Sequence, residues 1–180
     1  MKKLFVFAVL TVISFTALNA QNTRFGIKAG VNFSQISVDA NEFGSANSDS
    51  RTGFFVGGVA DIEVSEKFHV QPELLFSSEG GDNVPYNYIN VPIIAKYYVA
   101  EGFNIQAGPQ LGYLVSVDGE TDLEGANRLG FSLDMGIGYD INENFFAVVR
   151  YDLGLSNLID DSSIDAKQNS FQIGVGYRFN

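Results

Sequence analysis

Apolar and polar residues alternate with a period of two along most of the chain after residue 20. Over residues 129–141, one face carries large apolar side chains and the other carries small or acidic ones. A strand places alternate residues on opposite faces, whereas a helix of 3.6 residues per turn would mix the two sets. The same pattern predicts eight β-strands, at residues 24–36, 53–64, 68–78, 87–99, 103–117, 129–141, 145–156 and 169–179.

The connections between these strands alternate in length. Short links at 65–67, 100–102 and 142–144 take turns with longer ones at 37–52, 79–86, 118–128 and 157–168. Consecutive strands joined in this way run antiparallel, with the tight turns at one end and the long loops at the other. The sequence therefore predicts an all-β, eight-stranded antiparallel up-and-down barrel with three short turns and four longer loops.

The first twenty residues are predicted to be a secretory signal peptide. Lys2 and Lys3 precede an apolar run from Leu4 to Leu18, and Ala20 offers a small residue for cleavage. The run is short for a membrane-spanning helix, which needs about 20 residues. We expect two parts, a signal peptide at 1–20 and a barrel domain at 21–180, and hence export from the cytoplasm.

The apolar strand faces can point in two directions. In a secreted soluble lipocalin-like barrel they would enclose a ligand, and in a transmembrane barrel they would face lipid. An eight-stranded barrel has little interior room, and the apolar faces carry too many rings to fit inside. The transmembrane alternative is favoured by these outward-facing rings: Phe25, Phe33, Phe54, Phe68, Phe76, Tyr97, Phe103, Phe131, Tyr139, Phe145, Tyr151, Phe171, Tyr177 and Phe179.

The final strand carries a second indication of an outer-membrane barrel. Gln172, Gly174, Tyr177 and Phe179 resemble the C-terminal signal that the barrel assembly machinery of bacterial outer membranes recognises. In that pattern a polar residue is followed by glycine and then by two hydrophobic or aromatic residues two positions apart. Asn180 follows the aromatic residue with which such proteins usually end.

Several segments resemble the PorT-type outer-membrane β-barrel family of Bacteroidota. They are 25–32, 88–98, 107–113, 150–155 and 176–179, and the similarity extends over essentially all of the chain after residue 20. The resemblance implies a small outer-membrane barrel and assigns no activity, because most members have none assigned. The founding member is linked to type IX protein secretion, a role that these motifs do not carry over.

Charged residues recur on the polar strand faces, which the transmembrane alternative places in the barrel lumen. Buried charges are tolerated only when they are paired, so we expect a luminal charge network that plugs the barrel. The alternative is an ion path or gate through the same residues. The members are Lys28, Asp61, Glu63, Glu73, Lys96, Asp134, Arg150, Asp152 and Arg178.

Candidate catalytic chemistry is sparse. The chain has no cysteine and one histidine, His69, which lies next to a short turn. A general base needs an orienting carboxylate and a nearby nucleophile, and Ser77 is about 26 Å along the same strand. We therefore expect no enzyme and no cofactor, with His69 a structural residue of the lumen or its rim.

Composition adds a strong negative charge. The chain has 21 acidic and 11 basic residues, which argues against nucleic-acid binding. The expected long loops hold twelve acids against Arg51, Arg128 and Lys167. Asp118, Glu120 and Asp122 have the alternating spacing of a calcium loop, but Leu123 replaces its glycine. We expect the acidic loops to form a solvated crown, with a metal site at these three residues and divalent bridging to lipopolysaccharide as the alternatives.

These features favour an outer-membrane barrel with a structural or surface-interaction role, a filled polar lumen and acidic extracellular loops. The alternatives are a narrow or gated pore for a small solute and the soluble ligand-binding barrel. The expected partners are outer-membrane lipid, lipopolysaccharide and the barrel assembly machinery. No protein partner can be named from the residues.

Overall fold

The computed structural model describes residues 23–40, 44–47, 50–81, 84–117, 127–157 and 164–179. The predicted signal peptide lies outside these residues, so the boundary at residue 20 stays a prediction. No helix in the described ranges is long and apolar enough to cross a membrane. The strands are β1 (Thr23–Ala40), β2 (Gly44–Asn47), β3 (Arg51–Ser65), β4 (Phe68–Gly81), β5 (Val84–Tyr98), β6 (Phe103–Val117), β7 (Leu129–Asp140), β8 (Phe145–Gly154) and β9 (Ile164–Arg178).

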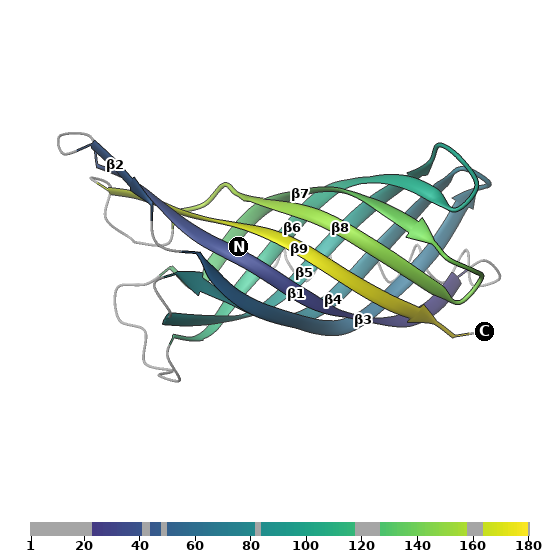
Figure 1. Ribbon diagram of the computed structural model, residues 1–180, viewed down its shortest axis with the longest axis horizontal. Coiled ribbons are helices and arrows are strands. Elements are labelled where there is room, and N and C mark those ends of the chain that lie inside the picture. The colour runs from purple at the N-terminus through teal and green to yellow at the C-terminus, as the bar shows by residue number, and fades with distance from the viewer. Residues whose placement is uncertain are drawn as a thin grey trace, which may run out of the picture.

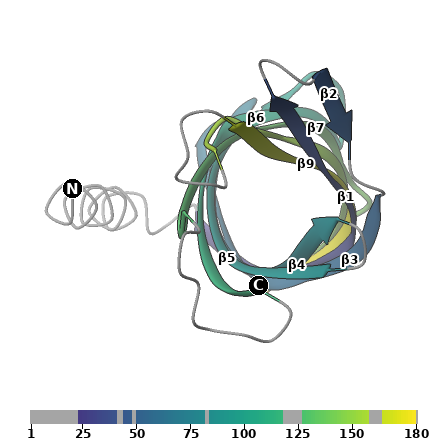
Figure 2. The same ribbon diagram turned by 90° about the vertical axis from the view of Figure 1, so that its left-hand side faces the viewer.

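Eight strands close into an antiparallel barrel. Each of β3 to β9 pairs with its neighbour along the chain, and β1 pairs with both β3 and β9. The β1–β9 pairing runs from Gly26 opposite Arg178 to Ala40 opposite Ile164 and joins the two ends of the sheet. Figure 1 shows the barrel from the side, and Figure 2 shows the closed ring from the long-loop end. The predicted fold class is confirmed.

Five strands (β1, β3, β4, β5 and β9) extend further at the long-loop end than the sequence predicted, whereas β8 ends at Gly154, two residues earlier. The expected long link 79–86 is wrong, because β4 and β5 continue pairing to Gly81 opposite Val84. The expected link 37–52 contains the end of β1 and the short strand β2, and β9 starts at Ile164 rather than residue 169. Outside a bilayer both faces of a strand can be polar, so the contrast between apolar and polar positions that reveals a strand is lost there.

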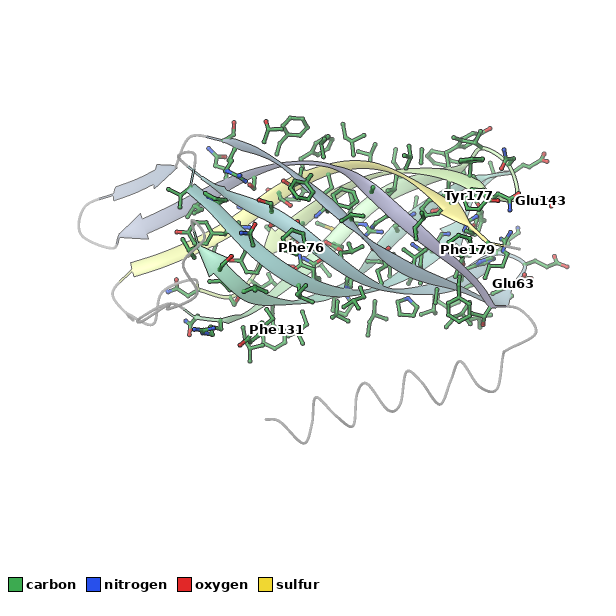
Figure 3. The ribbon with its side chains drawn as sticks, turned by 90° about the horizontal axis from the view of Figure 1, so that it is seen from below. Glu63, Phe76, Phe131, Glu143, Tyr177 and Phe179 are labelled. Atoms are coloured by element: carbon green, nitrogen blue, oxygen red, sulfur yellow. The ribbon has the colours of Figure 1, made fainter. Side chains whose placement is uncertain are left out.

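The apolar faces point outward, as predicted. Phe131, Met135 and Phe171 are 40–58% exposed, whereas Lys96 and Arg150 are 1% exposed inside the barrel. Aromatic side chains lie toward both ends of the outer surface, with Phe131 toward the long loops and Tyr177 and Phe179 at the short turns (Figure 3). Such girdles fit the two interfaces of a bilayer.

The lumen also contains apolar side chains that the sequence reasoning did not place there. Phe55 and Phe146 are buried inside together with several aliphatic residues. Luminal glycines on β1 and β9 give these rings room: a Cβ on Gly174 would lie 2.6 Å from the tip of Phe55, and one on Gly176 would lie 2.1 Å from Phe146. The aliphatic residues are Val59, Leu75, Ile94, Leu114 and Val148.

A ribbon of β1, β2 and β9 projects beyond the barrel at the long-loop end (Figure 1). The outward apolar residues of β1 and β9 end at Phe33 and Phe171, which pair with each other. The two strands then continue paired to Ala40 and Ile164, a further seven residues each, or roughly 20 Å. We call this part, residues 34–40, 44–47 and 164–170, the projecting ribbon.

Candidate functional site

The lumen is the candidate functional site because it gathers charged residues from seven of the eight barrel strands and buried amide side chains from β6. Its side chains form three clusters along the barrel axis. The lower cluster, nearest the short turns, is Asp61, His69, Lys96, Tyr98, Asp140 and Arg178. The central cluster is Lys28, Gln71, Glu73, Gln106, Asp134 and Arg150, and the upper cluster is Glu79, Tyr88, Asn90, Gln110, Asp152 and Gln168.

In the lower cluster two carboxylates meet two cations. Asp61 accepts hydrogen bonds from Lys96 Nζ at 2.9 Å and from His69 Nδ1 at 2.8 Å, and it lies 2.9 Å from Arg178 Nε. The two terminal nitrogens of Arg178 donate to Asp140 at 2.9 and 2.8 Å. Tyr98 donates its hydroxyl hydrogen to the same carboxylate at 2.8 Å. The cluster therefore cross-links β3, β4, β5, β7 and β9.

The central cluster is built around Glu73. Lys28 Nζ donates to this carboxylate at 2.5 Å, and Arg150 donates to both of its oxygens at 3.0 and 3.2 Å. Arg150 also donates to Gln106 at 2.9 Å and lies 3.5 Å from Asp134. A planar guanidinium that binds both oxygens of a carboxylate forms a strong and oriented contact.

The central cluster fills the middle of the lumen. Lys28 and Arg150 are 1% exposed, and Gln106, the most accessible of the six, is 6% exposed. Water therefore scarcely contacts these side chains in the described part of the lumen. A wide hollow of about 480 Å³ lies at the short-turn end and is lined by Tyr98, Asp140 and Glu143, among others.

The upper cluster contains two buried carboxylates, Glu79 and Asp152. Glu79 accepts hydrogen bonds from Ser77 at 2.6 Å, Asn90 at 3.2 Å and Gln168 at 2.5 Å. Asp152 accepts one from Gln110. Both carboxylates line a cavity of about 50 Å³ at the long-loop end of the lumen.

The predicted charge network can be compared with this geometry residue by residue. Seven of its members form ion pairs: Lys28, Asp61, Glu73, Lys96, Asp134, Arg150 and Arg178. Asp152 is buried without a cationic partner among the described residues. Glu63 is half-buried at the short-turn end, beside the bulge of β3, and forms none of the ion pairs that the described residues show (Figure 3).

Two luminal acids were missed by the sequence reasoning. Glu79 was expected in a long loop but is a buried residue of β4, and Asp140 was not included in the network. Both follow the inward-facing alternation of their strands: Glu73, Ser77 and Glu79 share one face. Extending the period of two past Phe76 would have found Glu79, but its flanking serines and glycines have the composition of a loop.

His69 lies in a structural setting. Its Nδ1 contacts Asp61, and its ring lies 4.8 Å from that of Tyr98. Ser77 is committed to Glu79 and to Asn32, which donates to it at 2.9 Å. The described residues therefore do not bring a nucleophile to His69. No three acidic, histidine or cysteine side chains in the described ranges are grouped to hold a metal ion, and Asp118, Glu120 and Asp122 lie outside those ranges.

The residues of the resembled assembly signal take part in barrel packing. Gln172 is buried in the lumen and Gly174 faces the ring of Phe55. Tyr177 lies on the outside, 4.9 Å from the ring of Phe145 and 5.7 Å from that of Phe179. Each residue thus has a structural reason for its identity, and recognition by an assembly machinery is an additional expectation.

Comparison with known proteins agrees with this geometry. Residues 5–179 match the outer membrane protein beta-barrel domain family. The chain belongs to this family. As a family member with a closed barrel and an apolar outer belt, it is an outer-membrane β-barrel protein.

Solved outer-membrane barrels have the same fold. Neisserial surface protein A superposes with a TM-score of 0.54 at 12% identity, over 86% of this chain and 97% of that one. Ail, the attachment invasion locus protein of Yersinia pestis, gives 0.51 at 19% identity, over 88% and 99%. These likenesses show the barrel architecture. No protein with a curated description matches the chain.

Proposed function

We propose that this protein is a closed outer-membrane barrel that acts through the surface at its long-loop end rather than as a conduit. The observation that carries the proposal is the central cluster, in which Lys28, Glu73 and Arg150 are almost inaccessible to water. A pore for even a small solute requires a water path along the axis. A lumen cross-linked by ion pairs instead supports a rigid scaffold.

The projecting ribbon supports a surface-interaction role. It stands beyond Phe33 and Phe171, where the outward apolar residues end, and is therefore outside the hydrocarbon. β8 pairs with β9 only from Asn169 onward, so within the described chain the segment 164–168 has β1 on one side and no strand on the other. An exposed strand edge is a surface on which another chain can add a strand.

The finer assignments form part of the same proposal. A cleaved signal peptide at 1–20 delivers the chain to the envelope, and the barrel assembly machinery inserts it through the last strand. Its class is the PorT-type barrel of Bacteroidota, a proposal supported by the motifs at 25–32 and 88–98. Outer-membrane lipid and lipopolysaccharide are its immediate surroundings, and no enzymatic role is assigned.

Planar-bilayer recording tests the closed lumen. The refolded wild-type protein should show no steady single-channel steps, and reproducible steps would favour the pore. The membrane assignment is tested in parallel by gel migration of the membrane fraction, which should change between unheated and boiled samples. A chain recovered without detergent would favour the soluble barrel instead.

The surface role is tested by trimming the ribbon. Replacing residues 37–48 with a short glycine-serine turn removes β2 and the tip of β1 but leaves the register of β1 with β3 intact. We expect this variant to retain heat-modifiable migration and to lose adhesion of expressing cells to other cells or to matrix. As a control, replacing four outward residues of the short turns, at the opposite end of the barrel, should leave adhesion unchanged. Equal adhesion by the trimmed and the intact protein would contradict the surface role.

A further inference from the structure

The three luminal clusters differ in their charge balance. The lower cluster sets Asp61 and Asp140 against Lys96 and Arg178. The central cluster sets its two carboxylates against Lys28 and Arg150. In the upper cluster, no lysine, arginine or histidine of the described chain lies within ion-pair distance of Glu79 or Asp152. The upper cluster therefore lacks two positive charges that its counterparts have.

Neither the ion pairs of the described residues nor the loops between the strands supply those charges. The loop segments outside the described ranges, at 41–43, 48–49, 82–83, 118–126 and 158–163, contain no lysine, arginine or histidine. Arg51 lies at the rim, but it donates to the main-chain oxygen of Glu79 at 3.0 Å and to Ser78 at 3.3 Å rather than to the carboxylate. Uncompensated buried carboxylates are costly, so these two either take up protons or receive a positive partner from outside the chain.

A separate observation places a ligand in the cavity itself. The Tyr88 side chain, more than nine-tenths buried, lines the cavity, and its hydroxyl has no hydrogen-bond partner among the described residues. Gln168 lines the same cavity, and its amide oxygen also lacks a partner in the described chain. Buried polar atoms normally have hydrogen-bond partners or ligands. The two unpaired oxygens therefore indicate that a bound partner is missing from the cavity.

We propose that the upper cluster binds one divalent cation of the calcium type between Glu79 and Asp152. A single divalent ion supplies the two charges that the cluster lacks. Calcium takes six to eight oxygen ligands from carboxylates, amide carbonyls and water. The cavity offers the carboxylates together with Tyr88, Asn90, Gln110 and Gln168, and its volume of about 50 Å³ holds an ion with a few waters.

The amide side chains around the cavity can change from hydrogen-bond donors into metal ligands. Asn90, Gln110 and Gln168 each donate an amide hydrogen to a carboxylate in the structure. A half-turn of an amide presents its oxygen in place of its nitrogen with little change of shape. When the ion binds the carboxylates, these amides can therefore change from donors to the acids into ligands of the metal. The site is independent of whether the barrel conducts.

Terbium luminescence is the sharpest test, because Tb³⁺ replaces Ca²⁺ and is excited through a nearby tyrosine. The chain has no tryptophan, so tyrosines are the sensitisers, and Tyr88 lies in the site. In the EDTA-treated, refolded full-length protein we expect tyrosine-excited terbium emission that Ca²⁺ removes by competition. Tyr88→Phe should lower this emission at least twofold, and unchanged emission in that variant would place the ion elsewhere and overturn the proposal.

Thermal unfolding of the same samples provides the second measurement. We expect saturating Ca²⁺ to raise the Tm of the wild type by roughly 5 °C. Glu79→Gln and Asp152→Asn should lose this rise, whereas Glu63→Gln, a half-buried acid at the opposite end, should retain it. An equal rise in all four proteins would assign the effect to loop acids and contradict the site.

The remaining outcomes also decide the question. If Glu79→Gln and Asp152→Asn do not fold, Tyr88→Phe retains both carboxylates and still reports on the ion through luminescence. A response to Na⁺ equal to that to Ca²⁺, or no response of the wild type to either, would overturn the divalent site. Because neither readout involves adhesion or conductance, failure here is distinguishable from failure of the proposed function.

Discussion

Arg150 on β8 donates hydrogen bonds to both carboxylate oxygens of Glu73 on β4, at 3.0 and 3.2 Å. The two strands lie on opposite sides of the closed barrel. The two residues lie 77 positions apart in the chain and are nearly inaccessible to water. This contact ties opposite walls of the barrel together through its interior. Backbone pairing connects neighbouring strands only, so the luminal contacts provide the bracing across the lumen.

Removing one member of this pair should destabilise the barrel strongly. Arg150→Ala leaves Glu73 with Lys28 as its cationic partner and opens space at the centre of the lumen. We expect a loss of about 3–5 kcal/mol in the free energy of unfolding, measured by urea denaturation of the refolded protein. Lys67→Ala, which removes an exposed cation in a short turn, should cost less than about 1 kcal/mol. Equal losses would contradict the role of the central cluster.

Removing both members should open the lumen. Glu73→Ala with Arg150→Ala deletes one charge of each sign and much of the volume that blocks the axis. We expect this double variant to show single-channel steps in a planar bilayer where the wild type shows none. The matched control is Glu66→Ala with Lys67→Ala, an exposed pair of opposite charges in a short turn. A silent double variant would mean that another cluster closes the lumen.

Gly174 should tolerate no side chain. An alanine Cβ at this position would stand 2.6 Å from Phe55 Cζ, so the ring must shift in a filled interior. We expect Gly174→Ala to cost about 1–3 kcal/mol and the added change Phe55→Leu to recover part of this loss. Gly58→Ala is the control, since its Cβ would meet only one atom within 4 Å, at 3.9 Å. No loss in Gly174→Ala would refute the packing role.

A charged residue introduced on the lipid-facing surface should lower the free energy of unfolding more, the deeper it lies in the membrane. Val175 is 61% exposed on β9, between the aromatic residues Phe171 and Phe179 that lie toward the two ends of the belt. Val175→Arg should cost about 2–4 kcal/mol in lipid vesicles, and Thr52→Arg at the rim should cost about 0–1 kcal/mol. The folded fraction of each variant, followed as denaturant is added, gives its free energy of unfolding and hence the difference. In a soluble barrel both substitutions would be equally harmless.

Much of the fold follows from the sequence because the bilayer imposes a simple rule on each strand. Where one face meets lipid and the other meets a polar lumen, alternation is clear, and the range 103–117 matches β6 to the residue. Outside the hydrocarbon region this alternation is no longer required. Residues 79–81 and 164–168 are strands outside the belt, and β2 was not expected, because nothing there requires one face to be apolar.

The site could be predicted only as a set of residues. Alternation shows that Glu73 and Arg150 face inward, but their contact depends on the tilt and register of all eight strands. For the same reason, the sequence did not show that Glu79 and Asp152 form no ion pair with a described lysine or arginine. The apolar side chains Phe55 and Phe146 were missed because they interrupt an otherwise polar face and are accommodated by glycines on other strands.

The pairing of β1 with β9 makes the final residues of the chain a condition for the whole structure. Until Ile164–Arg178 is available, the first strand has an open hydrogen-bonding edge, which hydrocarbon cannot satisfy. A growing or truncated polypeptide therefore has no stable halfway form inside a bilayer. Stable insertion therefore requires β9 as well as β1, and a chain whose barrel has not yet closed has to be kept from aggregating until it reaches the membrane.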